Sequence, residues 1–125
     1  MTPEEIFLLK KDILPRINYP IYLLYRDSNS EEMTLGEVDA IDVTTNEIWG
    51  YTEDEEANYY DCWDITHCKP YLRPMTSMTN EEVAEYEALT SIDDQIDYLN
   101  AHHFDYRGLI EIGLAVEAPA GLYNE

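Results

Sequence analysis

Two capping boxes divide this chain and limit what it can fold into. Thr2 and Glu5, with Pro3 between them, make the first box, and Thr79 and Glu82 make the second. In such a box the hydroxyl and the carboxyl group each accept a hydrogen bond from a backbone N–H group at a helix start. A helix is therefore expected at each position, and the interval between them is left for strands.

The first helix is predicted over residues 3–14. Its apolar residues recur at the spacing of one helix face, at Ile6, Leu9 and Ile13. Pro15 is expected to end the helix, because proline is poorly tolerated in a helix interior.

More helices are predicted after the second box. Residues 80–89 form one, and Ser91 is the expected N-cap of the next. In that next helix the apolar stripe is Ile92, Ile96 and Leu99, while the acidic residues that face away are Asp93, Asp94 and Asp97. Residues 102–114 are expected to form a turn and a short helix, and the residues from 117 onward a tail.

The interval between the boxes is predicted to hold strands. Short apolar and aromatic segments occur at residues 21–25, 35–43, 46–52 and 58–66. Their close spacing favours antiparallel hairpins. Residues 71–73 lie between two prolines, which predicts a sheet edge or an extended connector.

The predicted fold class is therefore α+β: an N-terminal helix, a small antiparallel sheet of three to five strands, and C-terminal helices packed on one side. With 125 residues, the chain is expected to form a single domain over residues 1–125. The predicted core of this domain is Ile21, Leu23, Val38, Ile41, Val83, Leu99 and Ile110.

The net charge of −20 sets the expected kind of partner. It results from 27 acidic residues against 7 Lys and Arg. Affinity for nucleic acid or for an anionic membrane depends on Lys and Arg, so direct binding to either is not expected. A basic protein surface is the complementary partner, although a high charge can also serve solubility alone.

Candidate partner-binding residues follow from charge and aromatic content. Acidic helix faces and loops can imitate a nucleic-acid backbone toward a groove lined with Lys and Arg. Tyrosine, present in 11 copies, suits binding surfaces as well as half-buried structural positions. The predicted partner-binding residues are Glu53, Asp54, Glu55, Glu56, Asp93, Asp94, Asp97, Tyr51, Tyr59 and Tyr60.

Catalytic and metal-binding patterns are weak. Cys62, His67 and Cys68 could join His102 or His103 around zinc, but their spacing differs from that of structural zinc sites. No phosphate-binding or nucleophile motif is present. We therefore expect no catalytic residues, no cofactor and two reduced, metal-free cysteines. The sequence also lacks a secretory signal and a membrane span, which predicts a cytoplasmic protein.

The C-terminal part resembles small uncharacterised proteins encoded by phages and prophages. The resemblance covers residues 69–123 and lies in three phrases: YLRPM at residues 71–75, SMT at 77–79 and HFDYRGLI at 103–110. It implies a bacterial host cell and brings no known activity or site residues. Arg73 and Arg107 lie within these phrases and are expected to be structural ion-pair partners.

Three hypotheses for function follow. The first is a phage-encoded acidic protein that inhibits a nucleic-acid-binding host protein by occupying its basic groove, as an anti-CRISPR or other anti-defence protein would. The second is a phage accessory or structural protein whose charge serves solubility only. The third is a small metal-binding protein or enzyme built on the cysteines and histidines.

Overall fold

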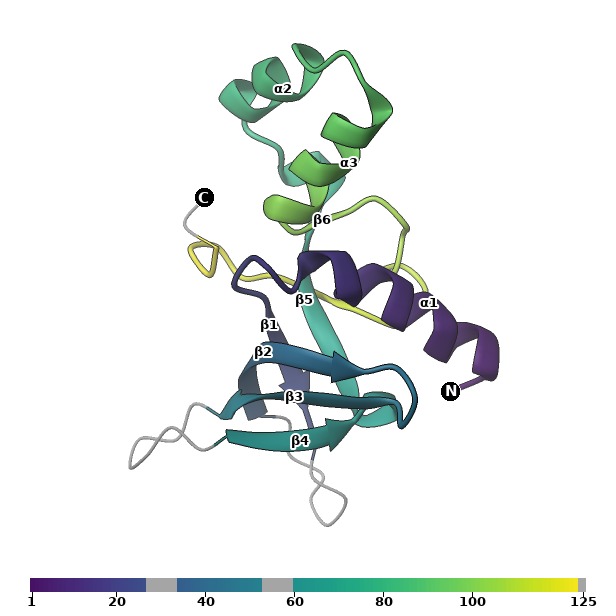
Figure 1. The fold of residues 1–125 in the computed structure, drawn as a ribbon. Helices are drawn as coiled ribbons and strands as arrows, with labels where there is room; N and C mark the ends of the chain where they lie inside the picture. The colour runs from purple at the N-terminus through teal and green to yellow at the C-terminus, as the bar shows by residue number, and fades with distance from the viewer. Residues whose placement is uncertain (27–33, 53–59, 124–125) are drawn as a thin grey trace. The chain divides into compact units, whose positions relative to one another are not determined.

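The computed structural model describes residues 1–26, 34–52 and 60–123 and has an α+β architecture (Figure 1). Contacts divide the chain into two compact units, residues 1–71 and residues 72–125. The predicted class, with an N-terminal helix, a sheet and later helices, is confirmed. Within the described residues the sheet has seven strands, which is more than predicted, and it is mixed, because it contains a parallel pair. None of the described helices is long and apolar enough to cross a membrane.

Helix α1 (Pro3–Ile13) begins the first unit as the capping box predicts. The Thr2 N–H donates to Glu5 Oε1 at 2.8 Å, and the Glu5 N–H donates to Thr2 Oγ1 at 3.1 Å. A short 3₁₀ turn, η1 (Leu14–Arg16), follows the helix and contains Pro15. Proline fits there because the first positions of a helical turn need no N–H donor. Leu9 and Ile13 are fully buried and join the core of this unit.

The first unit contains a run of antiparallel strands. In spatial order they are β4 (Tyr60–Asp64), β3 (Glu47–Thr52), β2 (Thr34–Asp42), β1 (Tyr22–Tyr25) and the first part of β5 (Cys68–Pro74). Figure 1 shows β2, β3 and β4 side by side. A 3₁₀ turn, η2 (Ile65–His67), connects β4 to β5. The four predicted strands therefore exist, and their ends within the described residues differ from the prediction by at most two residues; residues 58 and 59 of the last predicted strand lie outside the described part of the chain.

Close backbone packing on the buried face of this sheet requires glycine at Gly50. A Cβ atom added there would lie 2.0 Å from the Glu37 carbonyl oxygen, where β2 is bulged between Val38 and Ala40. Beside this point Tyr25 and Trp63 stack at 4.3 Å between ring centroids. Side chains on this face are therefore directed into the core, and the alternate ones point away from it.

Strand β5 corrects the expectation that residues 71–73 form a sheet edge or a connector. Its first part pairs with β1, and its last part pairs in parallel with β6 (Phe104–Asp105). It also pairs with β7 (Val116–Glu117), so Glu117, the predicted first residue of the tail, lies in a strand. The prolines are tolerated because other residues supply the hydrogen bonds: the Arg73 N–H donates to the His103 carbonyl, and the Leu72 carbonyl accepts from the Ala118 N–H, both at 2.8 Å.

In the second unit, α2 (Asn80–Glu87) and α3 (Ile92–Ala101) follow the short turn η3 (Met75–Ser77). The Thr79 capping box and the Ser91 N-cap are both formed. The predicted helix within residues 102–114 is wrong, because these residues form turns around β6. Gly108 and Gly113 have φ angles of +75° and +82°, which place them in turns as expected.

The predicted core is confirmed in part. Ile21, Leu23, Val38 and Leu99 are buried, whereas Ile41, Val83 and Ile110 are only half-buried. The predicted stripe on α3 is mostly exposed, since Ile92 is 73% and Ile96 is 40% exposed. An apolar spacing gives the face of a helix but not the extent to which neighbours cover it. A single shared core stays a prediction.

We predict that Leu99→Ala lowers the free energy of unfolding by about 2 to 5 kcal/mol, because it removes a buried side chain and leaves a cavity. Ile92→Ala on the same helix is the matched control and should change stability by less than about 0.5 kcal/mol. Urea unfolding of both variants measures the difference. Equal effects would contradict the burial of Leu99.

Candidate functional site

The exposed face of strands β2, β3 and β4 carries acidic and aromatic side chains. Along β3 the residues Ile48, Gly50 and Thr52 are buried, so the alternate residues Glu47, Trp49 and Tyr51 point to the opposite face. Cross-strand pairing extends that face into three rows. They are Asp42 with Glu47 and Asp64, Ala40 with Trp49 and Cys62, and Glu37 with Tyr51 and Tyr60. We call these nine residues, together with Asp39, the acidic aromatic face.

Three rings cluster across the middle row and one end row of this face. Tyr60 lies 5.9 Å from Trp49 and 5.0 Å from Tyr51 between ring centroids. Tyr51 is 44% and Tyr60 is 49% exposed, so the rings are open to a partner. The Tyr60 hydroxyl donates to Asp39 Oδ2 at 2.9 Å, and this hydrogen bond raises the pKa of Tyr60. It also holds the Asp39 carboxylate beside the aromatic rings.

At the opposite end of the face, three acidic residues stand in one cross-strand row. Asp42 accepts from the Thr44 and Thr45 N–H groups, and these bonds lower its pKa. The pKa of Asp64 is lowered by hydrogen bonds from the Thr66 hydroxyl and N–H. Both groups are therefore held in the ionised form. Like charges directly opposite one another destabilise a sheet, so this row is an electrostatic cost to the free protein.

Lys10 supplies a positive charge near this row, because its Nζ donates to Asn46 Oδ1 at 2.7 Å and to the Val43 carbonyl at 3.3 Å, in the turn between β2 and β3. Few other basic residues are available. The sequence has no Lys or Arg between Arg26 and Lys69, the interval that contains β2, β3 and β4. Arg16 is fully buried and pairs with Asp12 at 3.1 Å. The Arg107 guanidinium lies over the Tyr106 ring at 5.0 Å.

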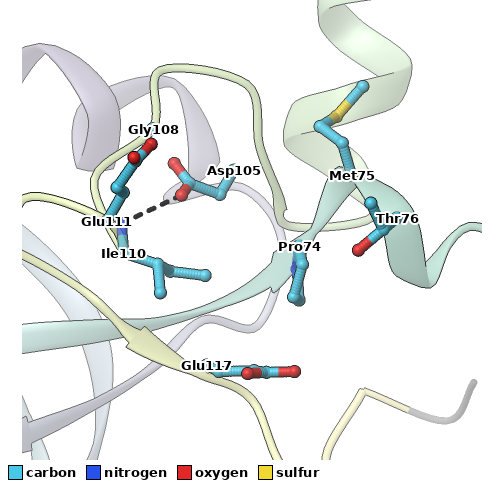
Figure 2. A pocket seen from close by; sticks show the side chains of 8 residues that line it. All are labelled: Pro74, Met75, Thr76, Asp105, Gly108, Ile110, Glu111 and Glu117. Carbon is cyan, nitrogen blue, oxygen red and sulfur yellow. Dashed lines mark hydrogen bonds between the residues drawn. The ribbon is translucent and has the colours of Figure 1, made fainter.

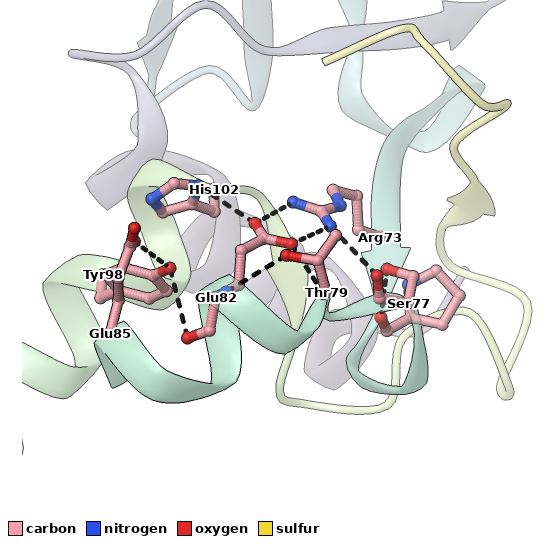
Figure 3. A network of polar contacts seen from close by, with 8 residues as sticks. Arg73, Ser77, Thr79, Glu82, Glu85, Tyr98 and His102 are labelled. Atoms are coloured by element: carbon pink, nitrogen blue, oxygen red, sulfur yellow. Dashed lines mark hydrogen bonds and ion pairs between the residues drawn. The ribbon is translucent and has the colours of Figure 1, made fainter. Parts of the chain in front are cut away.

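Arg73 is also buried and belongs to a polar network in the second unit (Figure 3). It makes two hydrogen bonds of 2.7 Å to the two carboxylate oxygens of Glu82. Glu82 also accepts from the Thr79 N–H, and His102 Nδ1 lies 3.5 Å from Glu82 Oε2. The Arg73 hydrogen bond lowers the pKa of Glu82 to about 2, against the opposing effect of burial. This network joins β5 to the start of α2 and has a structural role.

The predicted partner-binding residues fall into three groups. Tyr51 and Tyr60 meet on the acidic aromatic face. Asp93, Asp94 and Asp97 are exposed on α3, near the exposed Ile92 and Ile96. The remaining five, Glu53, Asp54, Glu55, Glu56 and Tyr59, lie outside the described residues.

Sequence reasoning missed the other members of the face, above all Trp49, Glu47, Glu37 and Asp39. The alternation in the segment EIWGYT could have indicated that Glu47, Trp49 and Tyr51 share one side of a strand. It could not have indicated which residues of β2 and β4 lie opposite. That depends on register and on the bulge after Val38.

The cysteines lie in two different environments. Cys62 is half-buried on the acidic aromatic face, where its Sγ donates to Glu47 Oε2 at 3.4 Å. Cys68 is buried, with Sγ 3.3 Å from the Asp64 carbonyl oxygen. Among residues 1–26, 34–52 and 60–123, no three His, Cys, Asp or Glu side chains are grouped to hold a metal ion.

No protein-family model, curated protein sequence or solved structure matches this chain.

We predict that iodoacetamide modifies Cys62 in the native protein and Cys68 only after unfolding. Burial raises the pKa of Cys68 to about 12, and the residue is 1% exposed, so almost no accessible thiolate forms at pH 8. Mass spectrometry of the labelled protein, with Cys62→Ser to assign the site, measures this. Equal labelling of both cysteines under native conditions would contradict it.

We also predict that Glu82→Gln destabilises the protein in a pH-dependent way. Because the folded-state pKa of Glu82 lies below the ordinary 4.5, its stabilisation is present above about pH 4.5 and is lost as the pH falls toward 2. At pH 7 the variant should lose up to about 3 kcal/mol, and near pH 2 wild type and variant should converge.

The matched control is Glu81→Gln, an exposed neighbour on α2. It should have little effect at either pH. Urea unfolding at pH 7 and near pH 2 tests the prediction, and a Glu82→Gln deficit that is the same at both pH values would refute the assigned role.

Proposed function

We propose that this chain is an acidic binding protein whose acidic aromatic face occupies a Lys- and Arg-rich groove of a nucleic-acid-binding protein. One observation carries the proposal: the half-buried Trp49 and the exposed Tyr51 and Tyr60 lie together among acidic residues on one face of the sheet.

Arginine is the side chain that such a surface suits best. Its guanidinium group stacks on aromatic rings and makes paired hydrogen bonds to carboxylates. The three rings would supply the stacking surface, and Asp39, held beside Tyr60, would supply a carboxylate. Aromatic residues are also enriched at protein interfaces.

The density of charge supports a groove that normally takes nucleic acid. Neighbouring strands lie about 4.8 Å apart, so the Asp42, Glu47 and Asp64 row places negative charges a few ångströms apart. A single nucleic-acid strand carries one charge about every 3.4 Å along its axis. A basic groove would therefore meet a comparable density of negative charge on this face.

The biological setting is part of the same proposal. The resemblance of residues 69–123 to phage and prophage proteins favours an inhibitor of a bacterial defence protein, such as a CRISPR effector or another nuclease. The inhibitor would act by steric occupation and would need no catalytic residue or cofactor. Its partner would be found by affinity capture from host cells, with nuclease treatment to exclude bridging by nucleic acid.

We predict that binding to the captured partner weakens steeply between 0.1 and 1 M salt, because the screening length shortens from about 10 Å to about 3 Å. Glu37→Gln combined with Glu47→Gln should slow association about tenfold, since charges mainly steer the encounter. Tyr51→Ser combined with Tyr60→Ser should speed dissociation about tenfold or more, since central aromatic residues dominate interface energy. Nucleic acid should compete with the protein.

The matched control is Glu81→Gln with Glu87→Gln, which removes the same charge from exposed positions on α2. Two further variants neutralise residues 53–56 together, or Asp93, Asp94 and Asp97 together, and test the other predicted acidic segments. Salt-insensitive binding that no charge variant alters would favour the accessory or structural hypothesis. An effect of the Asp93, Asp94 and Asp97 variant alone would move the site to α3.

A further inference from the structure

A cavity of about 380 Å³ opens on the second unit (Figure 2). Its apolar surface comes from Pro74, Met75 and Ile110, and its carboxyl groups from Asp105, Glu111 and Glu117. The two remaining lining residues, Thr76 and Gly108, are uncharged. The volume lies at the lower end of the range of ligand pockets, about 300 to 1,000 Å³, so the cavity suits one extended side chain.

Asp105 distinguishes this cavity from a group of surface acids. The residue is only 9% exposed, and its carboxylate accepts from the Leu109 N–H at 2.8 Å and the Ile110 N–H at 2.9 Å. In the described part of the chain no Lys, Arg or His lies within ion-pair distance of it. A buried carboxylate is costly without a cation, and two hydrogen bonds leave about half of its acceptor sites unused.

The rim of the cavity is also acidic. Glu111 and Glu117 are exposed, and in the view of Figure 2 the apolar side chains of Ile110 and Pro74 lie between Asp105 and Glu117. The complementary ligand therefore has an aliphatic stem that contacts the apolar surface and a positively charged end that meets the carboxylates. Lysine and arginine side chains have this form.

We propose that this cavity binds a single lysine or arginine side chain of a basic partner protein. The stem packs against Ile110 and Pro74, the cation donates a hydrogen bond to Asp105, and the rim glutamates add to the negative potential at the mouth of the cavity. The inference rests on the proposed function only in that the partner is basic. The cavity lies in the second unit and the acidic aromatic face in the first, so either proposal can fail while the other holds.

The test is an NMR titration of the whole protein with two model compounds, N-acetyl-lysine methylamide and its neutral Nε-acetylated form. The δ1 methyl signal of Ile110, assigned with Ile110→Val, reports on the cavity, because Figure 2 shows this side chain between Asp105 and Glu117. The charged compound should shift this signal with a Kd of about 1 to 10 mM, and the neutral one should not. The arginine analogue should bind at least as well.

Glu111→Gln combined with Glu117→Gln should weaken binding about tenfold. The matched control, Glu81→Gln with Glu87→Gln, removes the same charge from exposed positions on α2 and should leave the Kd unchanged. Circular dichroism checks that both variants are folded. The proposal is overturned if the Ile110 signal does not shift, if the neutral compound binds equally, or if the control weakens binding as much as the rim variant.

Discussion

Repulsion among 27 acidic side chains is the constraint that the rest of this structure has to meet, because only 7 Lys and Arg residues are available to offset it. Backbone N–H groups stabilise many of these carboxylates by donating hydrogen bonds to them. Glu5 and Glu82 accept them in capping boxes, Asp42 and Asp64 accept them in turns, and Asp105 accepts two. Helix starts and turns thus stabilise carboxylates that a more balanced chain would pair with lysine.

Some acidic residues lie outside this scheme. On the sheet, Glu37, Asp39 and Glu47 accept no backbone N–H bond among the described contacts and stand around the aromatic cluster. Arg16 and Arg73 are engaged in buried ion pairs, so neither reaches them. A surface of this kind is destabilising for the free protein and favourable against a basic partner, which is the physical basis of the proposed function.

Much of the fold could be predicted because its signals are local. The Thr2 and Thr79 boxes and the Ser91 cap placed three helices, and alternation with turn residues placed four strands. The incorrect predictions concerned contacts between segments that are distant in sequence. Leu72 and Arg73 bond to segments that lie more than 25 residues away in sequence, so no nearby pattern indicated that β5 has partners on both sides. Residues 116–117 likewise became a strand only through contact with β5.

The sequence by itself determined where helices begin, which segments extend, and that the chain suits a basic partner, because capping, periodicity and charge act over a few residues or as a sum over all of them. Only the tertiary structure decided that Asp39, Trp49, Tyr51 and Tyr60 share one face and that Asp105 is buried beside an apolar cavity. Strand register, a bulge and the pairing of distant strands bring those residues together, and these depend on packing between segments that no local pattern encodes.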